Sequence, residues 1–363
     1  MDLYGYIKKY GNKSFKELTL TDADKVILSY LAYIKFDGIV SNEDNKKPLL
    51  EVGNRFFETH AKRKPDIMAV QSAIDILEEI IKYPRFQELL LYNYKYEYNG
   101  DNEQFGALFI DYDDTHTFIA FKGTDDLVSG WKEDAELSYK FPVIAQARAV
   151  SYVNRKIPLF SKRKYILAGH SKGGNLAEVA AMYMKKSRYR KVTKIYSLDG
   201  PGLKEKEFFS NRYKRIDPKF ELVVPETAFV GMLLKQRSSK TIVKSKKKGI
   251  LAHNALYWLY DETIFKEGKL SSYSITLDKA IDDWLDQYSP KERKDFINDL
   301  FSIMDRAGIE SLLSIKENMI KSFIKIVQET KKLDPVHKEK LMSLFKFIID
   351  YTKEDFFNKN NEA

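Results

Sequence analysis

The pattern of apolar and polar positions along the chain changes near residues 85 and 270. Residues 1–85 are predicted to be mostly helical, and the stretch 66–82 carries apolar residues at helical spacing. An earlier stretch, 25–36, follows Thr21-Asp22-Ala23-Asp24, which is typical of a capped helix start. We therefore expect the first part of the chain to consist of helices.

The middle of the chain has the pattern of a sheet with covering helices. Short runs rich in aromatic and branched residues, separated by turn residues, predict antiparallel hairpins at 90–98, 104–112 and 115–123. Later strands are expected to alternate with helices: strands at 164–169, 192–198, 220–224 and 241–245, and helices at 142–156 and 174–186. This alternation predicts an α/β fold, with a mainly parallel sheet and helices on both faces.

Beyond residue 270 the pattern is helical and amphipathic. Ser289-Pro290-Lys291-Glu292 combines a cap, a proline at the first helical position and a capping-box glutamate. Asp334-Pro335 predicts a second helix start. We expect an N-terminal helical part at 1–85, an α/β core at 86–268 and a C-terminal helical region at 269–363.

Composition narrows the class of protein. The chain has 363 residues, is 44% hydrophobic and 13% aromatic, and is therefore expected to fold. The absence of cysteine excludes disulfides, thiolate zinc sites and cysteine nucleophiles. Because we find neither a signal-peptide pattern nor a run of 18 apolar residues, we expect a cytoplasmic protein.

The net charge of +9 raises the question of an anionic partner. Basic clusters occur at 185–191 and 244–248. No nucleic-acid motif accompanies them, so we expect solvated surface rather than a nucleic-acid site. Peripheral contact with an anionic membrane remains open, and the sequence does not reveal the oligomeric state.

A nucleophile is indicated by Gly169-His170-Ser171-Lys172-Gly173, which fits the pattern G-x-S-x-G. An apolar strand precedes it and a helix rich in small residues follows, as a sharp strand-to-helix turn requires. In such a turn the serine hydroxyl projects outward, and the helix N-terminus offers N–H groups to a developing oxyanion. We expect Ser171 to be a nucleophile.

A serine nucleophile needs a histidine base and an acid that orients it. Of the five histidines, His253 lies after the last predicted strand, where an α/β-hydrolase places its base. Asp199 ends the strand after the nucleophile strand and is the preferred acid, with Asp217 and Glu221 as alternatives.

Three further features complete the expected site. The backbone N–H of Lys172 directly follows the nucleophile and is one expected oxyanion donor. Thr124, after the strand that ends at Phe121, offers an N–H and an O–H for the second. Apolar residues between the acid and the base are candidates for an acyl pocket or for a core helix: Phe229, Met232 and Leu233. No cofactor or metal is expected.

These motifs resemble those of the class 3 lipases, a group of α/β-hydrolases, through FKGTDD, WKED and GHSKGGNLA. The chain is more similar still to the Mbeg1-like family, which shares these segments together with SLDGPG, VP…VGMLL and VKS…GI..H, from about residue 20 to 265. The resemblance implies the α/β-hydrolase fold, a Ser171–Asp199–His253 triad, and an oxyanion hole at Thr124 and Lys172.

The chain departs from the lipases at one position. Class 3 lipases usually place the acid in an Asp-x-Val-Pro segment, where this chain has Glu221-Leu222-Val223-Val224-Pro225. The expected activity is that of a serine esterase or lipase-like hydrolase on a small-molecule or lipid ester. The alternatives are an inactive binding or effector protein on the same fold and an acyltransferase with the same triad.

Overall fold

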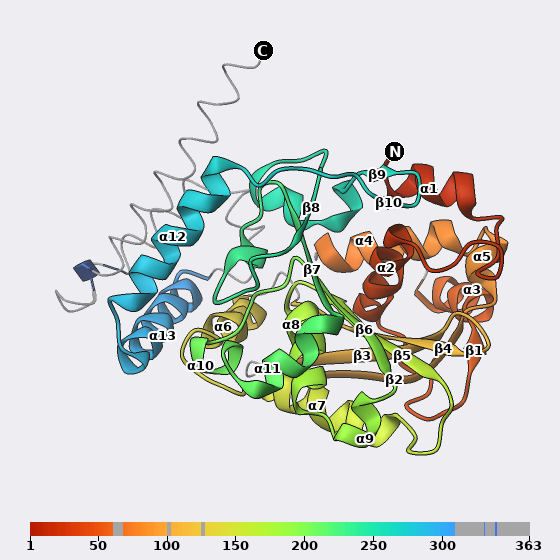
Figure 1. Ribbon diagram of the computed structural model, residues 1–363, viewed down its shortest axis with the longest axis horizontal. Coiled ribbons are helices and arrows are strands. Elements are labelled where there is room, and N and C mark those ends of the chain that lie inside the picture. The colour runs from red at the N-terminus through yellow and green to blue at the C-terminus, as the bar shows by residue number, and fades with distance from the viewer. Residues whose placement is uncertain (61–67, 100–102, 125–127, 309–329, 331–337, 340–363) are drawn as a thin grey trace, which may run out of the picture.

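One mixed sheet organises the structure, a computed structural model that describes residues 1–60, 68–99, 103–124, 128–308, 330 and 338–339 (Figure 1). Within these residues the sheet has eight strands, which lie side by side in chain order. Pairing is antiparallel from β1 to β4 and parallel from β4 to β8. The strands are β1 (Lys47–Pro48), β2 (Leu90–Asn99), β3 (Glu103–Asp111), β4 (His116–Phe121), β5 (Lys164–His170), β6 (Val192–Leu198), β7 (Phe220–Pro225) and β8 (Thr241–Val243).

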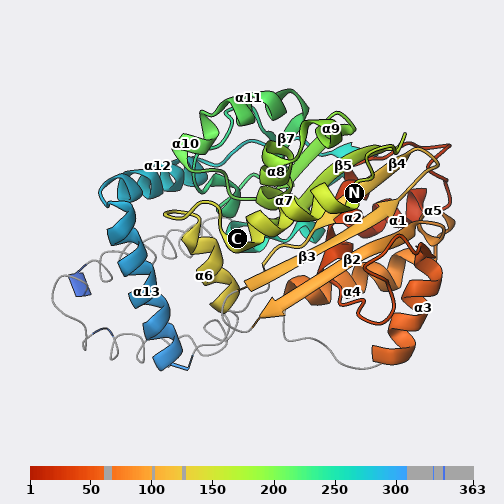
Figure 2. The same ribbon diagram turned by 90° about the horizontal axis from the view of Figure 1, so that it is seen from below.

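Helices cover both faces of this sheet, and Figure 2 shows the two layers on either side of the strands. One layer contains α1 (Leu3–Tyr10), α2 (Asp22–Tyr30), α3 (Leu49–His60), α4 (Met68–Ile80) and α5 (Pro84–Gln87). The other contains α7 (Ile144–Lys156), α8 (Lys172–Tyr183), α9 (Lys186–Tyr189) and α11 (Asn211–Ile216). The α/β-hydrolase architecture expected from the sequence is thereby confirmed.

The central strands are mostly apolar because each contributes side chains to two hydrophobic cores, one on either face of the sheet. Phe118 and Ala120 of β4 pack with the α1–α5 layer, whereas Ile119 and Phe121 pack with the α7–α8 layer. Side chains alternate between the faces of a strand, so burial on both faces requires a continuous apolar run.

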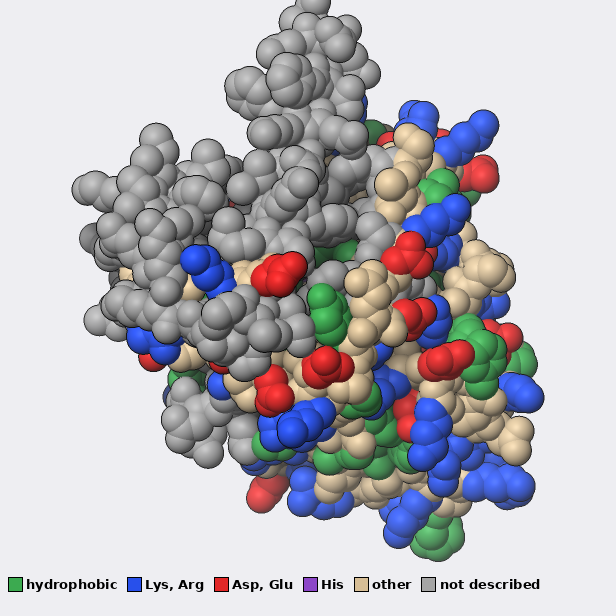
Figure 3. All heavy atoms as spheres, turned by 90° about the vertical axis from the view of Figure 1, so that its left-hand side faces the viewer, with side chains coloured by type: hydrophobic (Ala, Val, Ile, Leu, Met, Phe, Trp, Pro, Cys, Tyr) green, Lys and Arg blue, Asp and Glu red, His purple; other side chains and the backbone are tan. Residues whose placement is uncertain are grey.

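The remaining elements lie at the ends of the two layers. They are α6 (Val128–Glu136), α10 (Glu205–Phe208), α12 (Ser272–Asp286), α13 (Pro290–Arg306), and a small hairpin of β9 (Tyr260–Asp261) and β10 (Ile264–Phe265). Ser289 caps α13 and forms the expected capping box with Glu292. On the face where α12 and α13 lie, Figure 3 shows acidic and basic side chains interspersed among the described residues.

The predicted elements agree with the structure in type, and several boundaries shift by one to three residues; the strand expected at 241–245, for example, is β8 and ends at Val243. The helix expected at 174–186 is α8, which begins at Lys172 and ends at Tyr183. The helix thus begins two residues earlier than expected and includes Gly173, whose missing Cβ lets it lie against the carbonyl of Phe121. The helix predicted at Asp334-Pro335 lies outside the described residues, and the three-part division of the chain stays a prediction.

Neither a membrane-spanning helix nor a metal-binding cluster occurs in the part of the chain that the structure describes. No helix there combines the length and apolarity needed to cross a bilayer. The same residues contain no group of three or more His, Asp or Glu side chains arranged to hold a metal ion.

Candidate active site

Ser171 occupies a strained turn between β5 and α8. Its backbone has φ +58° and ψ −136°, a conformation that costs a non-glycine residue about 1–3 kcal/mol. Two backbone hydrogen bonds hold it, from Ser171 N–H to the Leu198 carbonyl (2.9 Å) and from Gly174 N–H to the Ser171 carbonyl (2.8 Å). Although Ser171 is the N-cap of α8, its hydroxyl makes no capping bond and so is not committed to the helix backbone.

The flanking glycines allow the strand and helix to approach closely. A Cβ atom on Gly169 would overlap the backbone of Gly173, and one on Gly173 would overlap the carbonyl of Phe121 at the end of β4. Larger residues at 169 or 173 would push α8 away from β4 and β5. The G-x-S-x-G spacing therefore reflects backbone contact as well as the conformation of the serine.

Asp199 and His253 meet at the same edge of the sheet. His253 Nδ1 lies 2.7 Å from Asp199 Oδ2. A carboxylate only accepts hydrogen bonds, so Nδ1 carries the proton and Nε2 keeps a free lone pair. His253 ends a 3₁₀ helix, Gly249–His253, in the segment after β8.

Asp199 is fixed by more than its histidine partner. It is fully buried and has φ +49°, a left-handed conformation that aspartate tolerates better than most residues. Its other carboxylate oxygen, Oδ1, accepts the backbone N–H of Gly231 at 2.9 Å. Sequence reasoning missed Gly231, because no motif marks a backbone donor 32 residues away.

The alternative acids lie elsewhere. Glu221 pairs with Lys194 near the start of β7, and Asp217 lies 3.5 Å from Arg237. Asp199 instead follows β6 at the end of the sheet where Ser171 follows β5. Of the three carboxylates considered, the structure brings Asp199 to the histidine.

His170 holds in place the 3₁₀ helix Gly249–His253, which carries the expected base and is called the base segment below. The sequence did not suggest this role. The ring centroid of His170 is 4.5 Å from that of His253, and its Nε2 lies 2.7 Å from the His253 backbone carbonyl. Because a carbonyl only accepts, Nε2 carries the proton, and Nδ1 accepts from the Tyr33 hydroxyl at 3.0 Å. Burial, and then repulsion from His253 when that ring is protonated, lower the pKa of His170, which favours this neutral form.

Thr124 lies beside the turn at Ser171, because the preceding residue, Gly123, packs against the carbonyl of His170. The Thr124 hydroxyl donates to Asp134 Oδ2 at 2.5 Å. The hydroxyl proton is therefore engaged by Asp134, so of the two donors expected from the sequence the backbone N–H is the remaining candidate, and its role stays a prediction. Burial raises the pKa of Asp134, whereas Lys172 and Thr124 lower it.

The side chain of Lys172 is buried and paired, although the sequence gave a role only to its backbone. Its side chain is 1% exposed, and its ammonium lies 2.7 Å from Glu133 Oε2 and 3.7 Å from Asp134 Oδ1. Glu133 also accepts the backbone N–H of Ala145, in the first turn of α7, at 3.2 Å. This cluster joins the N-termini of α7 and α8 to α6.

Helix α6, which carries Glu133 and Asp134, is supported from outside by α13. Phe301 and Met304 of α13 belong to a small apolar core against which Trp131 and Ala135 of α6 pack. Arg293 of α13 also donates to the Ser138 carbonyl at 3.1 Å. Helix α13 thus contributes to the surroundings of the two expected oxyanion donors.

The three residues expected to form an acyl pocket lie in or beside a short 3₁₀ helix, Val230–Met232. Met232 is buried in the core under α7 and α8, whereas Phe229 and Leu233 are partly exposed. A role for them in binding an acyl chain stays a prediction.

Comparison with known families gives a match to the Mbeg1-like family model over residues 80–302, more than half of the chain. The chain belongs to the Mbeg1-like family. The matched span of this Mbeg1-like chain includes Thr124, Ser171, Asp199 and His253, together with α6 and most of α13. No curated protein matches the sequence.

Two solved structures resemble this Mbeg1-like chain only loosely. A structure titled M37 lipase has a TM-score of 0.38 and 15% identity, over 72% of this chain and 80% of the other. The propeptide complex of Rhizomucor miehei lipase has a TM-score of 0.37 and 14% identity, over 60% of this chain and 66% of the other. Because both TM-scores lie below 0.4, neither likeness bears on what the chain does.

Proposed function

We propose that this chain is a serine hydrolase that cleaves carboxylic esters, with Ser171 as nucleophile, His253 as base and Asp199 as the acid that orients it. The observation that carries the proposal is the 2.7 Å contact between His253 Nδ1 and Asp199 Oδ2. This contact fixes the tautomer that leaves Nε2 basic.

The reaction follows from these groups. His253 Nε2 takes the hydroxyl proton as Ser171 Oγ attacks the acyl carbonyl, and the N–H groups of Lys172 and Thr124 stabilise the oxyanion. The imidazolium, stabilised by Asp199, then gives its proton to the leaving alkoxide, which departs as an alcohol. Water attacks the acyl-enzyme by the same route in reverse, which releases a carboxylic acid and restores the serine.

An acyl lipid or another aliphatic ester is the substrate class that we favour. Phe229, Met232 and Leu233 would line the acyl side of the site. The basic segment 244–248 precedes the base, and Ile250 within the base segment is 54% exposed. A cationic segment next to an exposed apolar side chain suits contact with an anionic lipid surface.

Hydrolysis of p-nitrophenyl esters of increasing acyl length tests this proposal. We expect activity in the wild type, a preference for octanoyl over acetyl, and a loss of at least about 1,000-fold in Ser171→Ala. Equal activity in Ser171→Ala would overturn the assignment of the nucleophile. A strong acetyl preference would contradict the lipid substrate and leave the esterase reaction standing.

A further inference from the structure

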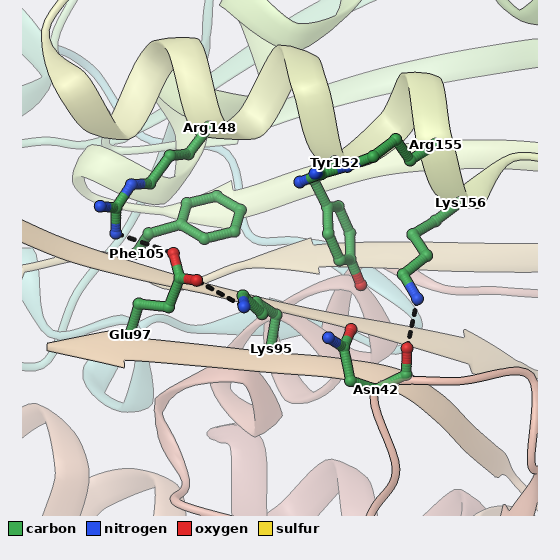
Figure 4. A pocket seen from close by; sticks show the side chains of 8 residues that line it. All are labelled: Asn42, Lys95, Glu97, Phe105, Arg148, Tyr152, Arg155 and Lys156. Atoms are coloured by element: carbon green, nitrogen blue, oxygen red, sulfur yellow. Dashed lines mark hydrogen bonds and ion pairs between the residues drawn. The ribbon is translucent and has the colours of Figure 1, made fainter.

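A separate hollow lies between α7 and the strands β2 and β3, and it contains none of the proposed catalytic residues. Figure 4 shows it with α7 on one side and the strands on the other. Its volume is about 310 Å³. The lining residues are Asn42, Lys95, Glu97, Phe105, Arg148, Tyr152, Arg155 and Lys156.

Positive charge exceeds negative charge in this lining. Four of the eight residues are cationic, and Glu97 is the one carboxylate among them. Glu97 already accepts ion pairs from Arg148, at 2.7 Å, and from Lys95. One carboxylate therefore serves two cations, and the lining retains a positive excess near Arg155 and Lys156.

Lys156 is a cation of the lining whose hydrogen-bond partner is uncharged. Its ammonium donates to the backbone carbonyl of Asn42, a neutral acceptor. Burial lowers the pKa of Lys156, and the positive charges of Arg155 and Lys95 lower it further, whereas Glu43 and Asp44 act in the opposite direction. An anion in the hollow would stabilise the charged form of this lysine.

The floor of the hollow is apolar and preformed. Phe105 and Tyr152 are 3% and 2% exposed, and their rings meet edge to face with centroids 5.8 Å apart. The Tyr152 hydroxyl donates to the backbone carbonyl of Asn93, which holds the ring in place. A ligand would therefore touch only the exposed edges of these two rings, which are held in place beside the cationic groups.

We propose that this hollow binds a small phosphate monoester, with the phosphate between Arg155 and Lys156 and the carbon skeleton against Phe105 and Tyr152. A guanidinium group donates paired hydrogen bonds to phosphate oxygens, and an ammonium adds a compact charge. A volume near the lower end for ligand pockets suits a short carbon skeleton. The same chemistry is presented by a free phosphate monoester and by the headgroup of phosphatidate.

Isothermal titration of the full chain with glycerol 3-phosphate and with inorganic phosphate, at fixed ionic strength, tests the site. The pocket variant is Arg155→Gln/Lys156→Gln. The matched control is Lys206→Gln/Lys214→Gln, which removes the same charge from exposed positions on α10 and α11. If the pocket variant does not fold, Arg155→Gln alone replaces it, because Arg155 is exposed.

We expect saturable binding that weakens at least about tenfold in the pocket variant and changes less than about twofold in the control. Equal weakening in both variants would overturn the site. The absence of saturable binding to the soluble phosphates and to phosphatidate vesicles alike would also overturn it. Phosphatidylcholine vesicles with and without phosphatidate identify the source: binding to phosphatidate vesicles alone, lost in the pocket variant, indicates the lipid headgroup. Because binding is measured without turnover, failure here leaves the proposed esterase reaction untouched.

Discussion

His170 donates a hydrogen bond from Nε2 to the backbone carbonyl of His253, across 83 residues of sequence. The residue before the proposed nucleophile thus anchors the backbone of the proposed base. The imidazole of His170 is itself oriented by the Tyr33 hydroxyl, which comes from the α2 side of the sheet. The buried ring of His170 therefore ties the residue next to Ser171 to Tyr33 on one side and to the backbone of His253 on the other.

Replacement of His170 tests whether this anchor positions the base. His170→Phe removes the donor and frees the base segment, so kcat should fall about tenfold with KM little changed. His170→Gln keeps an N–H donor of similar reach and should recover part of the loss. The measurement is steady-state ester hydrolysis by both variants across a pH series.

A purely structural role for His170 would give a different pattern. Both variants would then lose thermal stability and activity in parallel, and glutamine would bring no recovery in kcat. Unchanged kcat in the folded His170→Phe protein would show that the contact with His253 is not needed for turnover.

The buried pair of Lys172 and Glu133 predicts strong coupling in stability. Lys172→Met leaves Glu133 and Asp134 without their buried cation, so the free energy of unfolding should fall by about 3–5 kcal/mol. Adding Glu133→Gln removes one of the two stranded charges and should recover part of that loss. Urea unfolding of the two single variants and the double variant measures the coupling.

The matched control for this cycle is the pair of Lys82 and Glu79 at the surface, in which the lysine side chain is 56% exposed and the glutamate side chain 17%. Lys82→Met should change stability by less than about 1 kcal/mol. If Lys172→Met costs no more than Lys82→Met, the buried ion pair does not stabilise the fold.

Glu178 predicts a pH dependence of stability. Burial on α8 raises the pKa of Glu178 to about 8. The folded chain therefore keeps a proton that the unfolded chain releases above its ordinary pKa, so this group lowers stability as pH rises from about 5 to 8. Glu178→Gln should remove that decline and be stabilised relative to the wild type at pH 8.

Thermal unfolding at pH 5 and pH 8 measures this effect. The advantage of Glu178→Gln over the wild type should be larger at pH 8 than at pH 5. Glu205→Gln, at an exposed position on α10, should show no such change. Parallel curves for Glu178→Gln and the wild type would mean that the Glu178 pKa is not raised.

A methyl group added at Gly231 should displace the carboxylate of Asp199. A Cβ atom there would overlap Asp199 Oδ1, the oxygen that accepts the Gly231 N–H. Gly231→Ala should therefore move the carboxylate and lower kcat by about tenfold or more. Alanine at exposed Lys206 serves as the control; equal kcat in Gly231→Ala and that control would remove Gly231 from the support of Asp199.

The sequence predicted the features that depend on local pattern. The strands β4 and β5 were recognisable because burial on both faces requires unbroken apolar runs. The turn at Ser171 was recognisable because close strand-to-helix packing requires glycine at fixed positions. Asp199 and His253 were placed by chain order, and the structure brings these two side chains into contact.

What the sequence did not predict depends on tertiary packing. The pattern G-x-S-x-G leaves the residue after the serine open, so it gave no reason to pair the Lys172 side chain with Glu133, 39 residues earlier. That pairing depends on the placement of α6, which is supported by α13, more than 150 residues later in the sequence. The Gly231 donor and the His170 anchor were likewise invisible, because backbone hydrogen bonds leave no side-chain motif.

Labelling with a fluorophosphonate probe tests the central claim most directly, because such a probe reacts with a serine only when a base activates it. We expect folded wild-type protein at near-neutral pH to carry the label on Ser171, identified by peptide mass spectrometry, and His253→Ala to react far more slowly. Folded wild-type protein that takes up no label, or that carries it on a residue other than Ser171, would contradict the account.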